Sequence, residues 1–172
     1  MLTQRTIDVK SDRQVLLDFH CRINYESDSP WARAMPFERY RKLWLASSQP
    51  RQFLADLEQT LLDKRTIAEI WEDGGKTVSY VWATFKDSTD YGFTFAEIID
   101  IAVTPEYQDR GIATSILEHI EQLARAKGVV ILRSETGIEN QISQKLHTDA
   151  GFQVYRVGFE KVLKNPIKDL NK

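Results

Sequence analysis

The stretch EIIDIAVTPEYQDRGIATSILEHI, residues 97–120, decides the fold, because a strand, a tight turn and a helix follow one another directly in it. An apolar, β-rich run ends at Val103, and the Thr-Pro dipeptide after it marks a turn. Apolar side chains then recur at helical spacing over residues 111–127, and Gly128 closes the helix. The next element is a short apolar strand of the buried kind. The strand–helix–strand unit, residues 93–133, should therefore pair in parallel through a right-handed crossover.

The turn of this unit has the composition of a phosphate-binding site. Gln108, Gly111 and Ala113 form the pattern Q-x-x-G-x-A at the start of the helix. Backbone amides in the first turn of a helix have no partner within the helix and lie at the positive end of its dipole, so they suit a phosphate. Arg110 adds a guanidinium and Thr114 a hydroxyl. The pattern by itself is short, and the alternative is a plain turn in which small residues pack closely.

The rest of the chain predicts further elements around this unit. Two β-rich runs flank Asp73-Gly74-Gly75 and predict a hairpin, and the last strand rests on the alternation of Tyr155, Val157 and Phe159 with polar residues and glycine. The predicted order is β-α-α-β-β-β-α-β-α-β, an α/β (α+β) fold with a mixed, mostly antiparallel sheet. The predicted strands cover residues 5–10, 66–72, 76–86, 93–103, 129–133 and 155–159. The predicted helices begin at Ser11, Pro36 and residue 111, with a further amphipathic stretch from Phe53 to Leu61 and a short helix from Asn140 to Ala150.

Length and composition predict one domain. The 172 residues are 42% hydrophobic and 28% charged, as in ordinary globular proteins, so we expect a single domain over residues 1–164 and a flexible tail over residues 165–172. The net charge of -2 gives no electrostatic footprint for nucleic acid or a membrane surface. A polar N-terminus and the lack of a long apolar run predict a cytoplasmic protein. With one cysteine, Cys21, neither a disulfide nor a cysteine-based metal site is expected.

Two stretches carry a resemblance to a known family. Residues 97–114 closely resemble motif A of the GNAT superfamily of N-acetyltransferases, in which an apolar strand end is followed by x-P-x-Y-Q-x-x-G-x-A. Residues 140–152, NQISQKLHTDAGF, are similar to its motif B, N-x-x-A-x-x-L-Y-x-x-x-G-F. The order of elements also matches the family fold. The resemblance implies a GNAT fold whose sheet splays open where acetyl-CoA binds.

The resemblance also implies a cofactor site, with acetyl-CoA as co-substrate and no metal. The pyrophosphate is expected on the turn, and the pantetheine arm is expected to pair with the backbone at the strand end. Asn140 is expected near the pantetheine, and the alternative is that it only caps its helix. The cofactor-binding residues implied are Ile101, Ala102, Val103, Gln108, Asp109, Arg110, Gly111, Ile112, Ala113, Thr114 and Asn140.

The resemblance implies two catalytic residues. Glu97 matches a glutamate that serves as general base in some family members, because an ammonium must lose a proton before it can attack a thioester. Asp100 is a second candidate, on the opposite face of the strand unless a bulge intervenes. The family usually has Tyr where this chain has His147, and that Tyr protonates the departing thiolate. An imidazole can deliver a proton too. The alternatives are that Glu97 and His147 are ordinary strand and helix surface residues.

The acceptor side is less defined. Residues 25–37 lie between the first helices and combine aromatic side chains with carboxylates, which suits an amine; Tyr25 and Trp31 are the candidate substrate contacts. Packing of the same aromatics onto the core is equally plausible. We therefore predict an N-acetyltransferase that acts on a primary amine of a small molecule or peptide in a ternary complex, with a homodimer as one possible assembly. The alternative is a catalytically silent GNAT-fold module that binds acyl-CoA.

Overall fold

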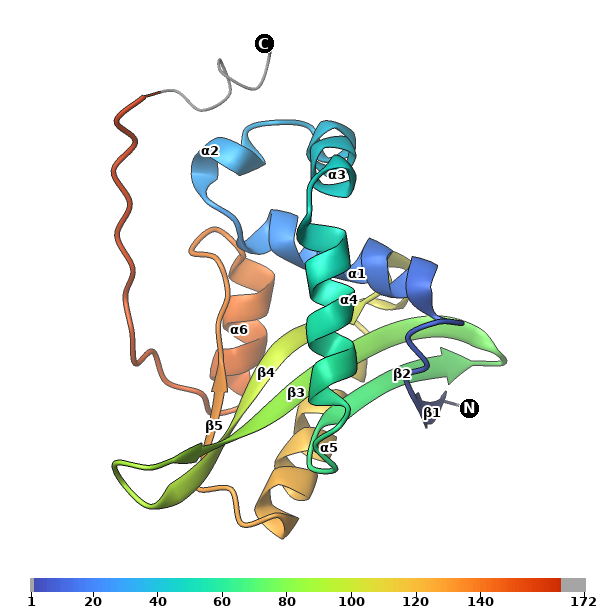
Figure 1. The fold of residues 1–172 in the computed structure, drawn as a ribbon, viewed down its shortest axis with the longest axis vertical. Helices are drawn as coiled ribbons and strands as arrows, with labels where there is room; N and C mark the ends of the chain where they lie inside the picture. The colour runs from blue at the N-terminus through green and yellow to red at the C-terminus, as the bar shows by residue number, and fades with distance from the viewer. Residues whose placement is uncertain (1, 165–172) are drawn as a thin grey trace.

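The computed structural model describes residues 2–164, which form one open sheet with helices on both faces (Figure 1). The sheet order is β1-β2-β3-β4-β5; the first four strands pair antiparallel, and β4 pairs with β5 in parallel. This confirms the predicted mixed sheet and its parallel unit. The strands are β1 (Leu2–Thr6), β2 (Ile67–Asp73), β3 (Lys76–Ser88), β4 (Phe93–Val103) and β5 (Ile131–Ser134).

The helices cover the two faces of the sheet with two separate apolar clusters. The first cluster packs α1, α3 and α4 onto one face, with Tyr80 and Trp82 of β3 among its buried members. The second packs α5 onto the other face through Ile112, Ile116 and Ile120. The helices are α1 (Arg13–Ser27), α2 (Pro30–Arg33), α3 (Phe37–Ala46), α4 (Gln49–Thr60), α5 (Ile112–Ala126) and α6 (Gln141–Asp149), with a 3-10 turn, η1, at Pro105–Tyr107.

A bulge in β4 changes the direction of the side chains beyond it. Trp82 of β3 pairs with Asp100, whereas the next residue, Ala83, pairs with Ile98. Ile99 is therefore the extra residue, and the alternation of faces is interrupted there. As a result Asp100 lies on the face of the sheet that α1 covers, where it contacts His20. Without the bulge, plain alternation would place Asp100 and Glu97 on opposite faces of the sheet.

The parallel pairing of β4 and β5 is short. It joins Phe95–Ile98 to Ile131–Ser134, and β4 then continues to Val103 without a neighbour on that side among the described residues. In residues 2–164, residues 99–103 thus have a strand partner only in β3. This open edge is the splay that the family resemblance implied.

The start of the chain differs from expectation. The first strand was predicted at residues 5–10 but ends at Thr6, because the Asp8 carboxylate accepts backbone N–H bonds from Lys10 and Ser11 and turns the chain. The helix predicted to begin at Ser11 begins at Arg13 instead.

The last predicted strand is wrong. Tyr155, Val157 and Phe159 lie in an extended segment that pairs with no strand of the described chain. Their side chains are exposed, Phe159 to 97%. Alternation specifies a strand only where a sheet edge is within reach. The predicted tail, residues 165–172, lies outside the described residues. None of the helices in residues 2–164 has the length and hydropathy needed to cross a membrane.

Candidate functional site

The turn between β4 and α5 presents free backbone amides. The first backbone hydrogen bond of α5 runs from the Ser115 N–H to the Gly111 carbonyl at 3.0 Å. No acceptor in the described chain is recorded for the amides of residues 111–114. Asp109 and Gly111 both have positive φ, 57° and 75°, which turns successive amides toward a common side. This geometry suits a phosphate.

Gly111 is required in this turn by its backbone rather than by crowding from the protein. A Cβ built on it would meet nothing within 4 Å, so the space beside the residue is open. Its left-handed conformation at the N-cap of α5 is one that L side chains rarely adopt. The open space beside free amides is what a ligand phosphate needs.

Cations gather at the same turn. The guanidinium of Arg110 lies 4.8 Å and the ammonium of Lys76 5.4 Å from the centre of the Tyr107 ring. The side-chain amide of Gln108 donates a hydrogen bond to the backbone carbonyl of Val103 at 3.2 Å and so connects the turn to the strand end. Lys76 was missed by the sequence analysis, because it comes from the hairpin of β2 and β3 and no local pattern links it to the turn.

A buried hydroxyl marks the strand end that leads into the turn. Thr104 Oγ1 is buried and has no hydrogen-bond partner in the described chain. Ile101, Ala102 and Val103, just before it, are half-buried. The open edge of β4 therefore offers unpaired backbone groups and one orphaned hydroxyl along the expected path of a pantetheine arm.

Glu97 lies on β4 before the bulge and is paired. Its Oε2 accepts a hydrogen bond from the ammonium of Lys86 on β3, and its side chain is 21% exposed. The carboxylate is thus held in place but still reachable by solvent. Its role as a base remains a prediction.

Asp100, the second candidate base, is buried away from solvent. It is 2% exposed, and its Oδ2 accepts a hydrogen bond from the Tyr80 hydroxyl at 3.0 Å and lies 2.6 Å from His20 Nδ1. Burial, followed by the nearby carboxylate, raises the pKa of Tyr80 well above its ordinary value, so Tyr80 remains a donor. The His20 ring stacks on Phe53 with centres 3.8 Å apart. The Asp100 carboxylate is therefore buried against Tyr80 and His20, and its role as a base stays a prediction.

His147 lies on α6, and only one of its two ring nitrogens has a hydrogen-bond partner in the described chain. Nδ1 is 2.7 Å from the carbonyl oxygen of Ser143, which makes it the N–H donor. Nε2 is buried and has no partner within the described residues. The ring packs edge-on against Phe152, 5.1 Å between centres. Only a fully protonated imidazole could therefore donate from Nε2.

Asn140 is a helix cap. Its side-chain oxygen accepts the Ser143 N–H at 3.2 Å at the start of α6. The structure thus shows the alternative named above, in which Asn140 caps its helix. A contact with pantetheine stays a prediction.

The two candidate substrate residues have different environments. The Tyr25 hydroxyl lies 2.9 Å from the carbonyl of Met35 and 3.1 Å from that of Arg33, and its ring packs edge-on against Phe37. It therefore fastens the loop between α1 and α3. Trp31 is half-buried in α2. A polar hollow of about 300 Å³ lies nearby, lined by Asn24, Ser27, Asp28, Tyr40 and Gln49.

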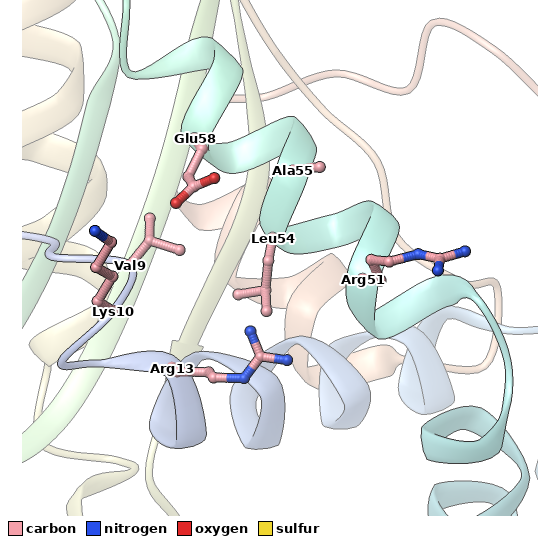
Figure 2. Close-up of a pocket in the computed structure, with 7 residues that line it drawn as sticks. All are labelled: Val9, Lys10, Arg13, Arg51, Leu54, Ala55 and Glu58. Atoms are coloured by element: carbon pink, nitrogen blue, oxygen red, sulfur yellow. The ribbon is translucent and has the colours of Figure 1, made fainter.

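A second hollow, of about 370 Å³, lies between the start of α1 and α4 (Figure 2). Its polar groups are cationic apart from one carboxylate, and none of the predicted site residues contributes to it. Its lining consists of Val9, Lys10, Arg13, Arg51, Leu54, Ala55 and Glu58. Across the described chain there is also no group of three or more side chains able to hold a metal ion.

Known proteins resemble the chain over most of its length. An aminoglycoside N(6')-acetyltransferase type 1 from Salmonella typhimurium is 27% identical over 103 residues, 58% of this chain and 71% of the relative. A predicted acetyltransferase from Clostridium acetobutylicum, solved with acetyl-CoA, is 16% identical with a TM-score of 0.69 and covers 95% of this chain and 97% of its own. Aminoglycoside 6'-N-acetyltransferase AAC(6')-Ih from Acinetobacter baumannii is 19% identical, with a TM-score of 0.64 and coverage of 95% and 100%. At these identities the two structures establish the fold alone.

The family model described as the acetyltransferase (GNAT) family matches residues 28–152. This range contains β4, the amide-rich turn and α6, which hold the motifs identified in the sequence. The match covers well over half of the chain, so this chain belongs to the acetyltransferase (GNAT) family.

Proposed function

We propose that the protein transfers an acetyl group from acetyl-CoA to a primary amine of a small polycationic molecule of the aminoglycoside type. The family match and the relatives support the expected enzyme class, an acetyl-CoA-dependent N-acetyltransferase. The observation that carries the cofactor site is the set of free amides at residues 111–114 beside the open space at Gly111. Acetyl-CoA bound through its phosphates at this turn would supply an activated thioester for the transfer.

Different parts of the protein bind the phosphates and the pantetheine arm of the cofactor. The amides of residues 111–114, with Arg110 and Lys76, hold phosphate oxygens. The open edge of β4 orients the arm between phosphate and thioester, because its backbone groups lack a strand neighbour on one side. An arm held along this edge would lead from the turn past the bulge at Ile99 toward Glu97.

Proton transfers fall to two side chains. Glu97 takes a proton from the acceptor ammonium through water, since the amine must be neutral to attack. His147 delivers a proton from Nε2 to the departing sulfur, which requires the doubly protonated ring because Nδ1 already donates to Ser143. Both steps use groups that the structure leaves reachable or unpartnered.

Carboxylates at the acceptor loop favour a cationic substrate. Asp28 lines the polar hollow and accepts a hydrogen bond from the Tyr40 hydroxyl at 3.1 Å. Glu26 is half-buried, and burial raises its pKa, so it gains from a cation placed beside it. Three curated relatives are named aminoglycoside N(6')-acetyltransferases, which supports an amine acceptor of that type. Tyr25 orders this loop, and Trp31 offers a ring to the amine.

Two observations favour a second function, acyl-CoA binding without catalysis. His147 stands in place of the usual Tyr, and Glu97 is engaged by Lys86. Release of CoA over a panel of aminoglycosides and polyamines distinguishes the two functions. Turnover on any of these amines supports the enzyme, whereas cofactor binding without turnover on all of them supports the silent module.

The cofactor site has its own test. Gly111→Val should weaken acetyl-CoA binding by about 100-fold or more, because a β-branched residue disfavours the left-handed conformation and its side chain would occupy the phosphate space. Calorimetry measures the affinity, and circular dichroism checks the fold. Gly128→Ala is the control, since Gly128 also has positive φ, 75°, but lies at the far end of α5. Unchanged affinity in folded Gly111→Val would remove the phosphate assignment.

A further inference from the structure

Transfer of an acetyl group to an ammonium requires the nitrogen to lose two protons, and the roles proposed above account for one of them. The first proton goes to Glu97 through water, before the amine attacks the thioester. Attack forms the carbon–nitrogen bond and leaves a positively charged nitrogen that still carries two hydrogens. One of these must leave as the carbon–sulfur bond breaks, while His147 protonates the sulfur. The reaction therefore needs a second proton acceptor close to the nitrogen.

The bulge at Ile99 brings a second carboxylate onto the face of the sheet that carries Glu97. Glu97 pairs with Thr84 of β3, and Asp100 pairs with Trp82, two residues away on the same strand. Side chains two residues apart on a strand point to one face, and Trp82 belongs to the cluster under α1. Glu97 and Asp100 therefore both point to the face that α1 covers. Two residues of strand span about 7 Å, so one acceptor molecule can reach both positions.

Asp100 is shielded from solvent, but it contacts a histidine that is not. Its side chain is 2% exposed, and His20 of α1, 15% exposed, lies 2.6 Å from it through Nδ1. Because a carboxylate accepts hydrogen bonds, Nδ1 carries a hydrogen, and in the neutral ring the lone pair is on Nε2. No partner for Nε2 is recorded within residues 2–164. Nε2 is therefore the atom at which this pair can take up a proton.

Neighbouring side chains fix the orientation of the His20 ring. Phe53 of α4 stacks on it with centres 3.8 Å apart and planes 7° from parallel, and the ring of Trp44 on α3 lies 6.0 Å away. The Tyr80 hydroxyl donates to the same carboxylate oxygen as His20, at 3.0 Å, and so holds Asp100 in place. A histidine oriented in this way by a carboxylate is the arrangement in which an imidazole acts as a general base.

Two further features lie around this pair. Thr84, which faces Glu97 across the strands, is 8% exposed, and its Oγ1 has no hydrogen-bond partner in the described chain. On α1, Asn24 and Ser27 follow His20 by four and seven residues and so lie on the same side of the helix. Both line the polar hollow of about 300 Å³. A polar acceptor placed here would satisfy the hydroxyl and extend into the hollow.

We propose that His20 is a second catalytic base, which takes the proton that the acceptor nitrogen still has to lose after it has attacked the thioester. Asp100 and Tyr80 are positioning residues that orient its ring. The proposal rests on the proposed function and adds a place for the acceptor, over Thr84 and between Glu97 and His20. The proton passes from nitrogen to Nε2, and the electron pair of the N–H bond stays on nitrogen. Collapse of the intermediate then restores the carbonyl group and expels the thiolate.

The first experiment separates proton transfer from packing. His20→Asn keeps an N–H that can donate to Asp100 but has no counterpart of Nε2, so the buried carboxylate stays paired. This variant should lower kcat by about 100-fold, near the lower end for a general base, because water can take part of these protons. Its affinity for acetyl-CoA, measured by calorimetry, should be unchanged.

His119→Asn is the matched control for this variant. His119 is also a helix histidine that pairs with a carboxylate, Glu69 at 3.2 Å, but it lies on the other face of the sheet, where its ring contacts Trp71. The control should keep kcat within about twofold. Circular dichroism checks the fold of both variants.

The second experiment tests basicity. His20→Ala should be partly restored by added imidazole, because the free ring can occupy the space beside Phe53 and take the proton. 1,2,4-Triazole has nearly the same size but is a far weaker base, so it should restore little. A ring that only fills space would restore activity equally in both cases.

The third measurement uses the unsubstituted protein, so it does not depend on the folding of a variant. His20 is one of three histidines, and the spectrum of His20→Asn or His20→Ala identifies its ring nitrogens in nitrogen NMR. With CoA bound, addition of an amine that the enzyme turns over should shift the Nε2 signal. A signal that saturating amine leaves unchanged would contradict the contact between His20 and the acceptor.

The outcomes distinguish this proposal from the proposed function. A wild type that binds acetyl-CoA but turns over no amine of the panel would overturn both. Turnover by the wild type together with a loss below threefold in His20→Asn, or equal restoration by imidazole and triazole, would overturn the role of His20 alone.

Discussion

Two regions of the chain, residues 93–126 from β4 through α5 and residues 140–164 from the start of α6 onward, each contain a glycine of positive φ, Gly111 at 75° and Gly151 at 85°. After Gly111 the chain enters α5, whose apolar face is buried against the sheet in the second cluster. After Gly151 the chain runs out with its apolar side chains exposed. A glycine of positive φ is therefore followed by buried apolar side chains in one region and by exposed ones in the other. Apolar side chains after such a glycine become buried only where another surface of the protein lies within their reach.

The largest effect should come from the first region. Glu97→Gln should lower turnover by about 10²–10⁴-fold while acetyl-CoA affinity barely changes, because the amide cannot accept the proton of the acceptor. Steady-state kinetics at saturating acetyl-CoA measures the effect. It would show that chemistry resides in the strand that the sheet orders on both sides.

The control for this prediction is Glu72→Gln on β2. Glu72 has similar exposure, 22% against 21%, and is also paired with a cation, Arg5. Its replacement should leave turnover within about twofold, as for a surface change away from the site. A loss below threefold in Glu97→Gln would reassign the proton to water or to the small fraction of neutral amine.

The next prediction compares stability in the two regions. Ile116→Ala on α5 should lower the free energy of unfolding by about 2–5 kcal/mol, because Ile116 is fully buried in the second cluster. Ile142→Ala on α6 should change it by less than about 0.5 kcal/mol, because Ile142 is 77% exposed. Urea denaturation measures both.

A large destabilisation by Ile142→Ala would mean that this side chain is packed against the rest of the protein, as Leu146 of the same helix is. The contrast between the two regions would then fail.

The difference between these regions also explains what the sequence could predict. The β4–α5 unit was predicted because its signals are local: a proline-marked strand end, a glycine at the N-cap and an apolar stripe. The last strand was predicted wrongly because alternation describes the strand but not the edge it needs. The shift of the first strand came from Asp8, whose bonds to two nearby amides outweighed β propensity.

Contacts between distant residues account for most of what the sequence missed at the site. His20 and Asp100 are eighty residues apart and meet only because the bulge at Ile99 turns Asp100 toward α1. A bulge depends on the pairing register of two strands, and a single sequence does not show the register. Lys76 reaches Tyr107, in the turn before α5, in the same way, from the hairpin of β2 and β3. The catalytic and cofactor roles carried over from the resemblance stay predictions.

The smallest effect should come from His147, which tests whether the second region takes part in the chemistry at all. Nδ1 donates to the Ser143 carbonyl, so the ring can give a proton from Nε2 only while both nitrogens are protonated. A doubly protonated imidazole gives up its proton at a lower pH than a phenol does. The rate with saturating acetyl-CoA should therefore fall on the alkaline side in the wild type. In His147→Tyr this limb should move up by more than about one pH unit, and His147→Ala should lose the limb together with most of the turnover. The measurement is a pH–rate series on the three proteins, with His119→Ala as the control, because His119 is also half-buried on a helix but pairs with Glu69. Identical profiles for the wild type and His147→Ala would leave α6 as a scaffold, and all the chemistry would then belong to β4 and the turn after it.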